Sequence, residues 1–173
     1  MNALIFDLEA TGLLRQDSKV HCLVIQDATT GEQWSYDDSF NFTGHIDEGY
    51  ERLERADQLI GHNIIGYDVP LLAEQGVLVE GELIDTLVLS KIYYPHMSDL
   101  DHQRQPDGLP KRLYGRHGLE AWGYRLKFNK GDFGKQENAW DQYTVEMLDY
   151  CQQDVRLSGK LYELMTRRMH DYS

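Results

Sequence analysis

The amino-acid sequence predicts an α/β domain with a mixed sheet whose opening meander is antiparallel. Strand-like segments come first in the chain, at residues 3–8, 20–28 and 32–37. Short strands then alternate with helix-favouring segments, and residues 144–170 contain no proline and a single glycine. This order is typical of a sheet that begins as a meander and continues through helical crossovers.

The opening strands are separated by clear turn residues. The apolar run ALIFDL at residues 3–8 is followed by Thr11 and Gly12. The segments 20–28 and 32–37 flank Thr29-Thr30-Gly31, which predicts a hairpin whose second strand is more exposed.

The middle of the chain alternates between the two element types. Residues 46–57 are polar and favour a helix, and LIGHN at residues 59–63 reads as a short buried strand. A helix is expected to begin near residues 67–70, because proline is tolerated in a first turn. Another short strand and a helix are expected within residues 83–94.

The C-terminal half is expected to be helical after a long loop. Three of the four prolines fall in residues 95–115, which predicts that loop. Residues 117–126 are expected to form a helix with one apolar stripe, and Trp122 in this stripe is expected to pack in the core. Residues 144–170 are helical as well, and the pattern leaves open a break near Tyr150.

Length and composition fit one domain spanning residues 1–173. The chain has a mass of 20.1 kDa, with 41% hydrophobic and 27% charged residues. It has no apolar run of about 18 residues and no basic, signal-like start, so we expect neither membrane association nor secretion. Cys22 and Cys151 lie in different apolar segments, which indicates a reducing compartment, here the cytoplasm.

The net charge of −12 argues against tight nonspecific binding of nucleic acid. A carboxylate-rich site can nevertheless bind cations that meet a phosphate. Basic residues are also concentrated locally, at Lys111, Arg112, Arg116, Arg125, Lys127 and Lys130. The charge therefore leaves a nuclease open.

Asp7 and Glu9 form the first acidic pair. Side chains two apart on a strand point to the same face, so both carboxylates lie side by side. Burying such charges is costly unless they are compensated, and a shared cation would compensate them. A solvated pair of acids at a strand end explains the same pattern equally well.

Two further sites carry polar residues with ordinary structural explanations of their own. Asp68 lies at an expected helix start, where an acid complements the helix dipole, and Asn63 suits a turn. Tyr150 and Asp154 are four residues apart and share one helix face, as many Tyr–Asp pairs on half-buried helices do. Each feature by itself is weak evidence for a site.

Together, D-x-E, HNxxxYD and Y-x3-D resemble the three motifs of the DEDDy branch of the DnaQ-like 3′→5′ exonucleases. The segments IDTLVLS (84–90), LPKRLYGRHGLEAWGYRL (109–126) and EMLDYCQQDV (146–155) are similar to the proofreading exonuclease domain of podophage family A DNA polymerases. The similarity covers nearly the whole chain and implies a ribonuclease-H-like fold. No polymerase domain follows, so we expect a free-standing exonuclease or one chain of a split enzyme.

The resemblance implies a site for two divalent cations. Asp7, Glu9 and Asp154 would hold one ion, Asp7 would bridge to the second, and Asp68 would reach that second ion through water. All-oxygen ligation suits Mg²⁺ or Mn²⁺ rather than zinc. Tyr150, with Glu9, would orient the attacking water, because a phenol with a pKa of about 10 is better suited to positioning than to proton abstraction.

The resemblance also implies substrate contacts. Thr11 matches a residue at the 3′ terminus, Leu13 an apolar residue inserted between the terminal bases, and Asn63 a residue lining the cleft. Tyr114 is a candidate for stacking on a base, with ordinary packing as the alternative. His117, near a helix start, is expected to be a capping or surface residue.

The predicted function is therefore two-metal-ion hydrolysis from the 3′ end of single-stranded or frayed DNA, releasing nucleoside 5′-monophosphates. A separate DNA polymerase is a candidate partner, and the host cytoplasm is the expected location if the chain is virally encoded. The sequence lacks zinc-ligand pairs such as HxxxH, a GxSxG elbow and a GxxxxGK[ST] loop. Two alternatives stay open: an exoribonuclease on the same scaffold, and an inactive module that binds a polymerase.

Overall fold

The computed structural model describes residues 1–11, 18–38, 44–128 and 139–171. Within these ranges the strands form one mixed sheet in the order β4-β3-β2-β1-β5-β6. Their bounds are Ala3–Ala10 (β1), Val20–Asp27 (β2), Gln33–Asp37 (β3), Gly44–His45 (β4), Gln58–Gly61 (β5) and Glu82–Asp85 (β6). Strands β1, β2 and β3 are antiparallel neighbours, while β1, β5 and β6 run parallel. The predicted mixed sheet with an antiparallel opening meander is confirmed.

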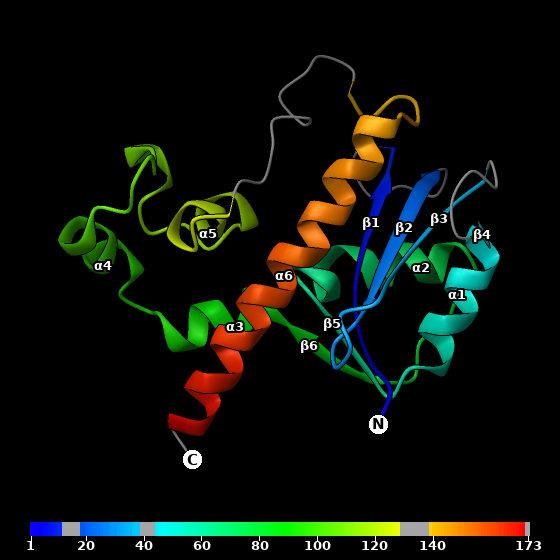
Figure 1. Ribbon diagram of the computed structural model, residues 1–173, viewed down its shortest axis with the longest axis horizontal. Coiled ribbons are helices and arrows are strands. Elements are labelled where there is room, and N and C mark those ends of the chain that lie inside the picture. Colours follow the sequence, from blue (N-terminus) through cyan, green and yellow to red (C-terminus); the bar gives the residue numbers. More distant parts are fainter. Residues whose placement is uncertain (12–17, 39–43, 129–138, 172–173) are drawn as a thin grey trace.

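Helices cover both faces of the sheet (Figure 1). Their bounds are Ile46–Arg55 (α1), Val69–Glu74 (α2), Thr86–Tyr93 (α3), Met97–Arg104 (α4), Leu119–Arg125 (α5) and Val145–Asp171 (α6). Two short turns add to them, a π-helical turn at Ile64–Asp68 (η1) and a 3₁₀ turn at Lys111–Leu113 (η2). Helices α1 and α2 pack on one face, and the long α6 crosses the other.

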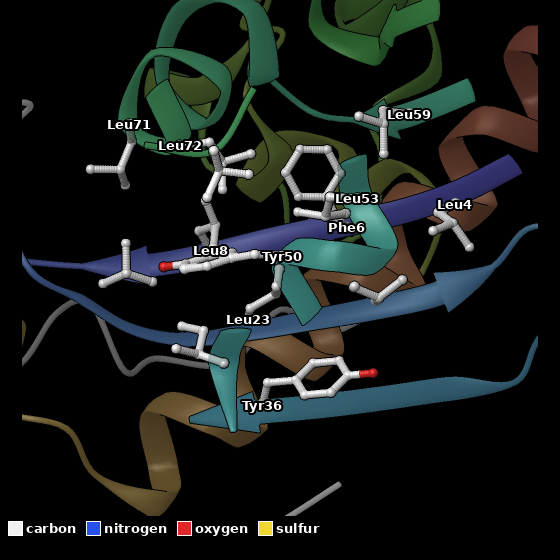
Figure 2. Packing of buried hydrophobic residues seen from close by; sticks show 14 of the residues in the cluster. Leu4, Phe6, Leu8, Leu23, Tyr36, Tyr50, Leu53, Leu59, Leu71 and Leu72 are labelled. Carbon is white, nitrogen blue, oxygen red and sulfur yellow. The ribbon is translucent and has the colours of Figure 1, made fainter. Parts of the chain in front are cut away.

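The alternation along β1 assigns its side chains to these two layers. Leu4, Phe6 and Leu8 point into the core that the sheet forms with α1 and α2 (Figure 2). Ile5 lies on the opposite face, in the cluster formed with α6. Since side chains alternate along a strand, Asp7 and Glu9 belong to the α6 face as well.

The prediction of a long loop at residues 95–115 is wrong, because this segment contains α4 and η2. Its prolines lie outside α4, at positions 95, 106 and 110, so they bracket the helix instead of interrupting it. Only Met97 and Asp101 of α4 are buried, and so few buried positions leave no apolar stripe for a sequence pattern to detect. The buried Asp101 pairs with Arg125 of α5, which anchors the helix.

The break considered near Tyr150 is absent, since α6 runs without interruption from Val145 to Asp171. The helix expected near residues 67–70 begins at Val69, directly after η1. Among the described residues, no helix is both long and apolar enough to cross a membrane. Both cysteines are buried and free.

Candidate active site

A small acidic pocket lies where the C-terminal halves of β1 and β5 meet α6. Its volume is ≈ 230 Å³. Segments far apart in the sequence line it: Asp7, Leu8 and Glu9 from β1, His62, Asn63, Tyr67 and Asp68 after β5, and Trp140, Tyr150 and Asp154 from the C-terminal region. The pocket thus brings together the four acids of the sequence motifs, Tyr150 and Asn63.

Strand β1 contributes the first two carboxylates. Asp7 pairs with Val24 of β2 and Glu9 with Cys22, and the register shifts directly after Glu9. Such an irregularity ends regular pairing and bends the strand. Glu9 is only 8% exposed, so its carboxylate is held inside the pocket wall.

The connection after β5 delivers Asp68. Asn63 adopts a left-handed conformation (φ 62°) and is followed by the π-helical turn that ends at Asp68. The buried carboxylate of Asp85 accepts backbone hydrogen bonds from Asn63 (2.9 Å), Ile65 (3.0 Å) and Leu87 (2.9 Å). Asp85 therefore ties this unusual turn to the start of α3 and fixes the position of Asp68.

Helix α6 contributes Tyr150 and Asp154, one turn apart on the side that faces β1. Between them in sequence, the thiol of Cys151 donates to the carbonyl oxygen of Asp7 at 3.4 Å and lies 3.6 Å from its Oδ2. The Trp140 ring meets the Tyr150 ring edge-on, with centroids 5.7 Å apart. The contacts of Cys151 hold α6 against β1 at the level of the acids.

The pocket is strongly unfavourable for negative charge. Burial, followed by the charges of Asp7 and Asp154, raises the pKa of Glu9 well above its usual range. Burial also raises the pKa of Asp68, and the charges of Asp7, Asp85 and Asp154 add to it. No lysine or arginine is among the described residues that line the pocket. A bound cation would supply the missing positive charge.

The donor atoms suit a hard divalent cation. Ligand atoms of Asp7, Glu9 and Cys151 all lie within 4.8 Å of one another. Burial and the neighbouring thiol of Cys22 raise the pKa of Cys151, so its sulfur stays protonated and is a poor ligand. The carboxylate oxygens remain, and oxygen ligation favours Mg²⁺ or Mn²⁺.

The predicted substrate residues fall in different places. Asn63 lines the pocket. Thr11 does not line it, and its hydroxyl lies 3.2 Å from the His21 ring. Tyr114 also lies outside the lining and packs edge-on against His102, with centroids 4.9 Å apart. Leu13 is outside the described residues.

Trp122 and His117, which were expected to lie outside the site, make structural contacts. Trp122 is buried and donates from Nε1 to Ser90 Oγ at 2.8 Å, as expected of a core residue. The ring of His117 lies 2.6 Å from the same hydroxyl and is half-buried instead of capping a helix. Neither residue lines the acidic pocket.

Sequence reasoning missed three residues with polar or aromatic side chains in the pocket wall. Tyr67 directly precedes Asp68 in the HNxxxYD motif, and that adjacency could have suggested it. His62 stands next to Asn63 in the same motif, with Nε2 2.9 Å from the carbonyl oxygen of His117. Trp140 lies outside every motif, so no sequence pattern pointed to it.

Comparisons with known proteins give relatives by sequence and by fold, although no family model matches the chain. The DNA-directed DNA polymerases of Escherichia phage T7 and Enterobacteria phage T3 are each 33% identical over 190 aligned residues. The alignment covers 96% of this chain and 27% of each polymerase. The chain therefore spans about a quarter of the length of these relatives.

Solved structures with the same fold include nucleases and a polymerase. Brucella melitensis NrnC matches with a TM-score of 0.67 and 17% identity, covering 98% of this chain and 74% of NrnC. NrnC with bound Mg²⁺ matches with a TM-score of 0.63, 17% identity and the same coverage of both chains. The family B DNA polymerase of Pyrobaculum calidifontis matches with a TM-score of 0.54 and 18% identity, over 95% of this chain and 24% of the polymerase. These likenesses support the ribonuclease-H-like arrangement of sheet and helices.

Proposed function

Because this chain belongs to the DnaQ-like exonuclease family, we propose that it is a divalent-metal-dependent 3′→5′ exonuclease acting on DNA. One observation carries the proposal: carboxylates from β1, η1 and α6 line a single pocket together with Tyr150. The reaction is hydrolysis of the terminal phosphodiester bond with release of a nucleoside 5′-monophosphate.

The four carboxylates divide into two overlapping ligand sets. Asp7, Glu9 and Asp154 would hold one cation, while Asp7 would also hold the other, which Asp68 would reach through water. Two bound divalent ions would activate the attacking water and stabilise the departing 3′ oxygen. The solved structure of NrnC with Mg²⁺ supports this choice of cofactor for a chain of the same fold.

The tyrosines of the pocket are suited to hydrogen bonding. Tyr150, together with Glu9, would orient the attacking water. The edge-on contact with the Trp140 ring restricts the ring of Tyr150. Burial and the charges of Asp68 and Glu9 raise the pKa of Tyr67, which keeps its hydroxyl protonated. Tyr67 would therefore donate to a phosphate oxygen and does not act as a base.

The size of the pocket favours an unpaired strand end. The pocket has a volume of ≈ 230 Å³, and its acids Glu9, Asp68 and Asp154 are at most 8% exposed. A single terminal nucleotide would therefore reach these acids. A base-paired terminus would have to fray before its scissile phosphate reached them. Asn63 would contact this nucleotide, and Thr11 and Leu13 would contact the strand at its 3′ terminus and terminal bases.

A cleavage assay tests the proposal. We expect 5′-labelled single-stranded DNA to give a ladder from the 3′ end in Mg²⁺ or Mn²⁺, and no products in chelator. Asp7→Asn should remove the ladder, whereas the exposed control Asp99→Asn should keep it. Cleavage that persists in chelator would contradict the metal mechanism.

An exoribonuclease is the second candidate. Metal-ion cleavage of a phosphodiester does not require deoxyribose, and discrimination depends on contacts near the 2′ position. The structure of NrnC bound to pGG supports this candidate, because it shares the fold over 98% of this chain. Faster loss of a matched RNA strand in the same assay would favour it over DNA.

A polymerase is the partner that the relatives suggest. The aligned region makes up 27% of the T7 and T3 enzymes, which join it to further sequence in one polypeptide. We propose that this chain edits for a separate polymerase in the cytoplasm of the host. A pull-down with candidate polymerases tests this, and an inactive binding module would be retained there but fail the cleavage assay.

A further inference from the structure

A second groove, larger than the acidic pocket, lies along the C-terminal half of α6. Its volume is ≈ 630 Å³, and it shares no lining residue with the acidic pocket. We call it the α6 groove and define it by the charged and aromatic residues of its wall, Phe128, Arg156, Lys160, Tyr162, Glu163 and Arg167. Side chains of β1 and β2 complete its floor.

Three cations of the α6 groove lie on one side of the helix. Arg156, Lys160 and Arg167 are separated by four and seven residues, which keeps them within about 40° around the helix axis. They extend over 11 residues, or about 17 Å. All three are exposed, and in the described parts of the chain no ion pair joins them to a carboxylate.

This positive stripe stands out in a chain with a net charge of −12. A single acid, Glu163, lies among the residues that line the groove. An excess of cations concentrated on one line attracts a ligand with repeated negative charges. The three cations are spread too far along the helix to meet the phosphate of one mononucleotide.

Flat side chains accompany the cations. Lys160 Nζ lies 5.4 Å from the centre of the Phe128 ring, and Tyr162 is half-buried in the same wall. Gly159 brings the helix close to the sheet, since an added Cβ would lie 3.3 Å from Ile5 Cδ1 and Gln26 Nε2. Cations beside aromatic rings are the combination that holds single-stranded nucleic acid without sequence preference.

We propose that the α6 groove is a second binding site for single-stranded nucleic acid, which holds the phosphate backbone away from the cleaved end. The inference rests on the proposed function, because the groove would let an acidic nuclease retain a polyanionic substrate. Arg156 lies two residues after Asp154 on the same helix, so the groove begins about 3 Å farther along α6 but on another side of the helix.

The test measures binding of labelled dT20 in chelator, where no cleavage is expected. Lys160→Gln/Arg167→Gln should weaken binding about tenfold and make the negative slope of log K against log salt shallower by roughly 1.4, or about 0.7 per lost phosphate contact. The matched control, Arg55→Gln/Arg104→Gln, removes the same charge from exposed positions elsewhere and should bind like wild type. Equal thermal unfolding midpoints would show that both variants fold.

Several outcomes would overturn the assignment. Wild-type affinity and salt slope in the groove variant, or an equal loss in the control, would mean that the groove does not hold the strand. Displacement of dT20 by thymidine 5′-monophosphate would assign a mononucleotide site instead, and equal displacement by polyglutamate would assign an acidic protein segment. If the chain binds dT20 through the groove but releases no nucleotides in Mg²⁺, the proposed function fails while this inference stands.

Discussion

Two buried aspartates, Asp68 in the acidic pocket and Asp101 in α4, have pKa values shifted in opposite directions. They are 3% and 2% exposed. Burial, together with the charges of Asp7, Asp85 and Asp154, raises the pKa of Asp68. Burial also acts to raise the pKa of Asp101, but hydrogen bonds from Arg125 and the Gly115 N–H outweigh it and lower that pKa.

The difference lies in what each carboxylate contacts. Asp101 accepts from Arg125 Nε at 3.0 Å, from its Nη2 at 2.8 Å, and from Gly115 N at 2.8 Å, so the protein itself compensates the charge. In the acidic pocket the neighbours are other acids. A buried acid with a buried cation is compensated within the fold, whereas a cluster of like charges stays unfavourable until protons or bound cations neutralise it.

The largest expected effect is on turnover, from Asp7→Ala. Removing a carboxylate shared by both ligand sets should lower kcat by about 10³-fold or more, comparable to losing a principal transition-state stabiliser. The metal-free protein should keep or gain stability, because one of the repelling charges is gone. Single-turnover cleavage and urea unfolding measure the two effects.

Near-normal turnover in Asp7→Ala would mean that the acidic pocket is not the catalytic site. A clear loss of stability in chelator would mean that Asp7, like Asp101, is compensated by the protein.

The next effect is on stability, from Asp101→Asn. This change leaves the guanidinium of Arg125, whose side chain is 7% exposed, without its counter-charge, and should cost about 3–5 kcal/mol of unfolding free energy. The exposed pair of Arg112 and Glu120 serves as the control, since Glu120→Gln should cost no more than about 1 kcal/mol. Equal costs in urea unfolding would remove the contrast between a buried and an exposed pair.

A smaller effect is expected in the pH dependence of stability without metal. A raised folded pKa means that Glu9 and Asp68 bind protons more tightly in the folded state. Their contribution is fully present below the unfolded pKa of about 4 and is lost as the pH rises through the folded pKa. Asp101 behaves oppositely, because its contribution is lost as the pH falls through its lowered pKa.

Urea unfolding at a series of pH values in chelator can separate the two groups. Asp68→Asn should reduce the loss of stability as the pH rises above about 4, and Asp101→Asn should reduce the loss at lower pH. Added Mn²⁺ should restore stability of the wild type at neutral pH. A profile that Asp68→Asn leaves unchanged would show that this carboxylate is already compensated.

The smallest expected effect comes from Tyr150→Phe. The ring keeps its edge contact with Trp140 and loses only the hydroxyl, so we expect kcat to fall about 10- to 100-fold with metal binding intact. Mn²⁺ titration followed by thermal unfolding would check the binding. A loss as large as that of Asp7→Ala would assign Tyr150 a role beyond orienting water.

Local patterns in the sequence were enough for most strands, and together with the family resemblance they identified the four acids and Tyr150 of the acidic pocket. Alternation along β1 placed Asp7 and Glu9 on one face, and the four-residue spacing placed Tyr150 and Asp154 on one side of a helix. The resemblance of the motifs to a known family joined these pairs to Asp68. Their roles as metal ligands and water-positioning groups stay predictions.

Other features depended on contacts that no local pattern contains. Helix α4 has two buried residues, and its anchor is an ion pair with α5 across 24 residues of sequence. Trp140 reaches Tyr150 from outside any motif, and the three hydrogen bonds of Asp85 span up to 22 residues. The sequence by itself determined which side chains of β1 and of α6 share a face, because backbone periodicity is local. Only the tertiary structure decided which faces meet, because burial and charge compensation come from residues distant along the chain.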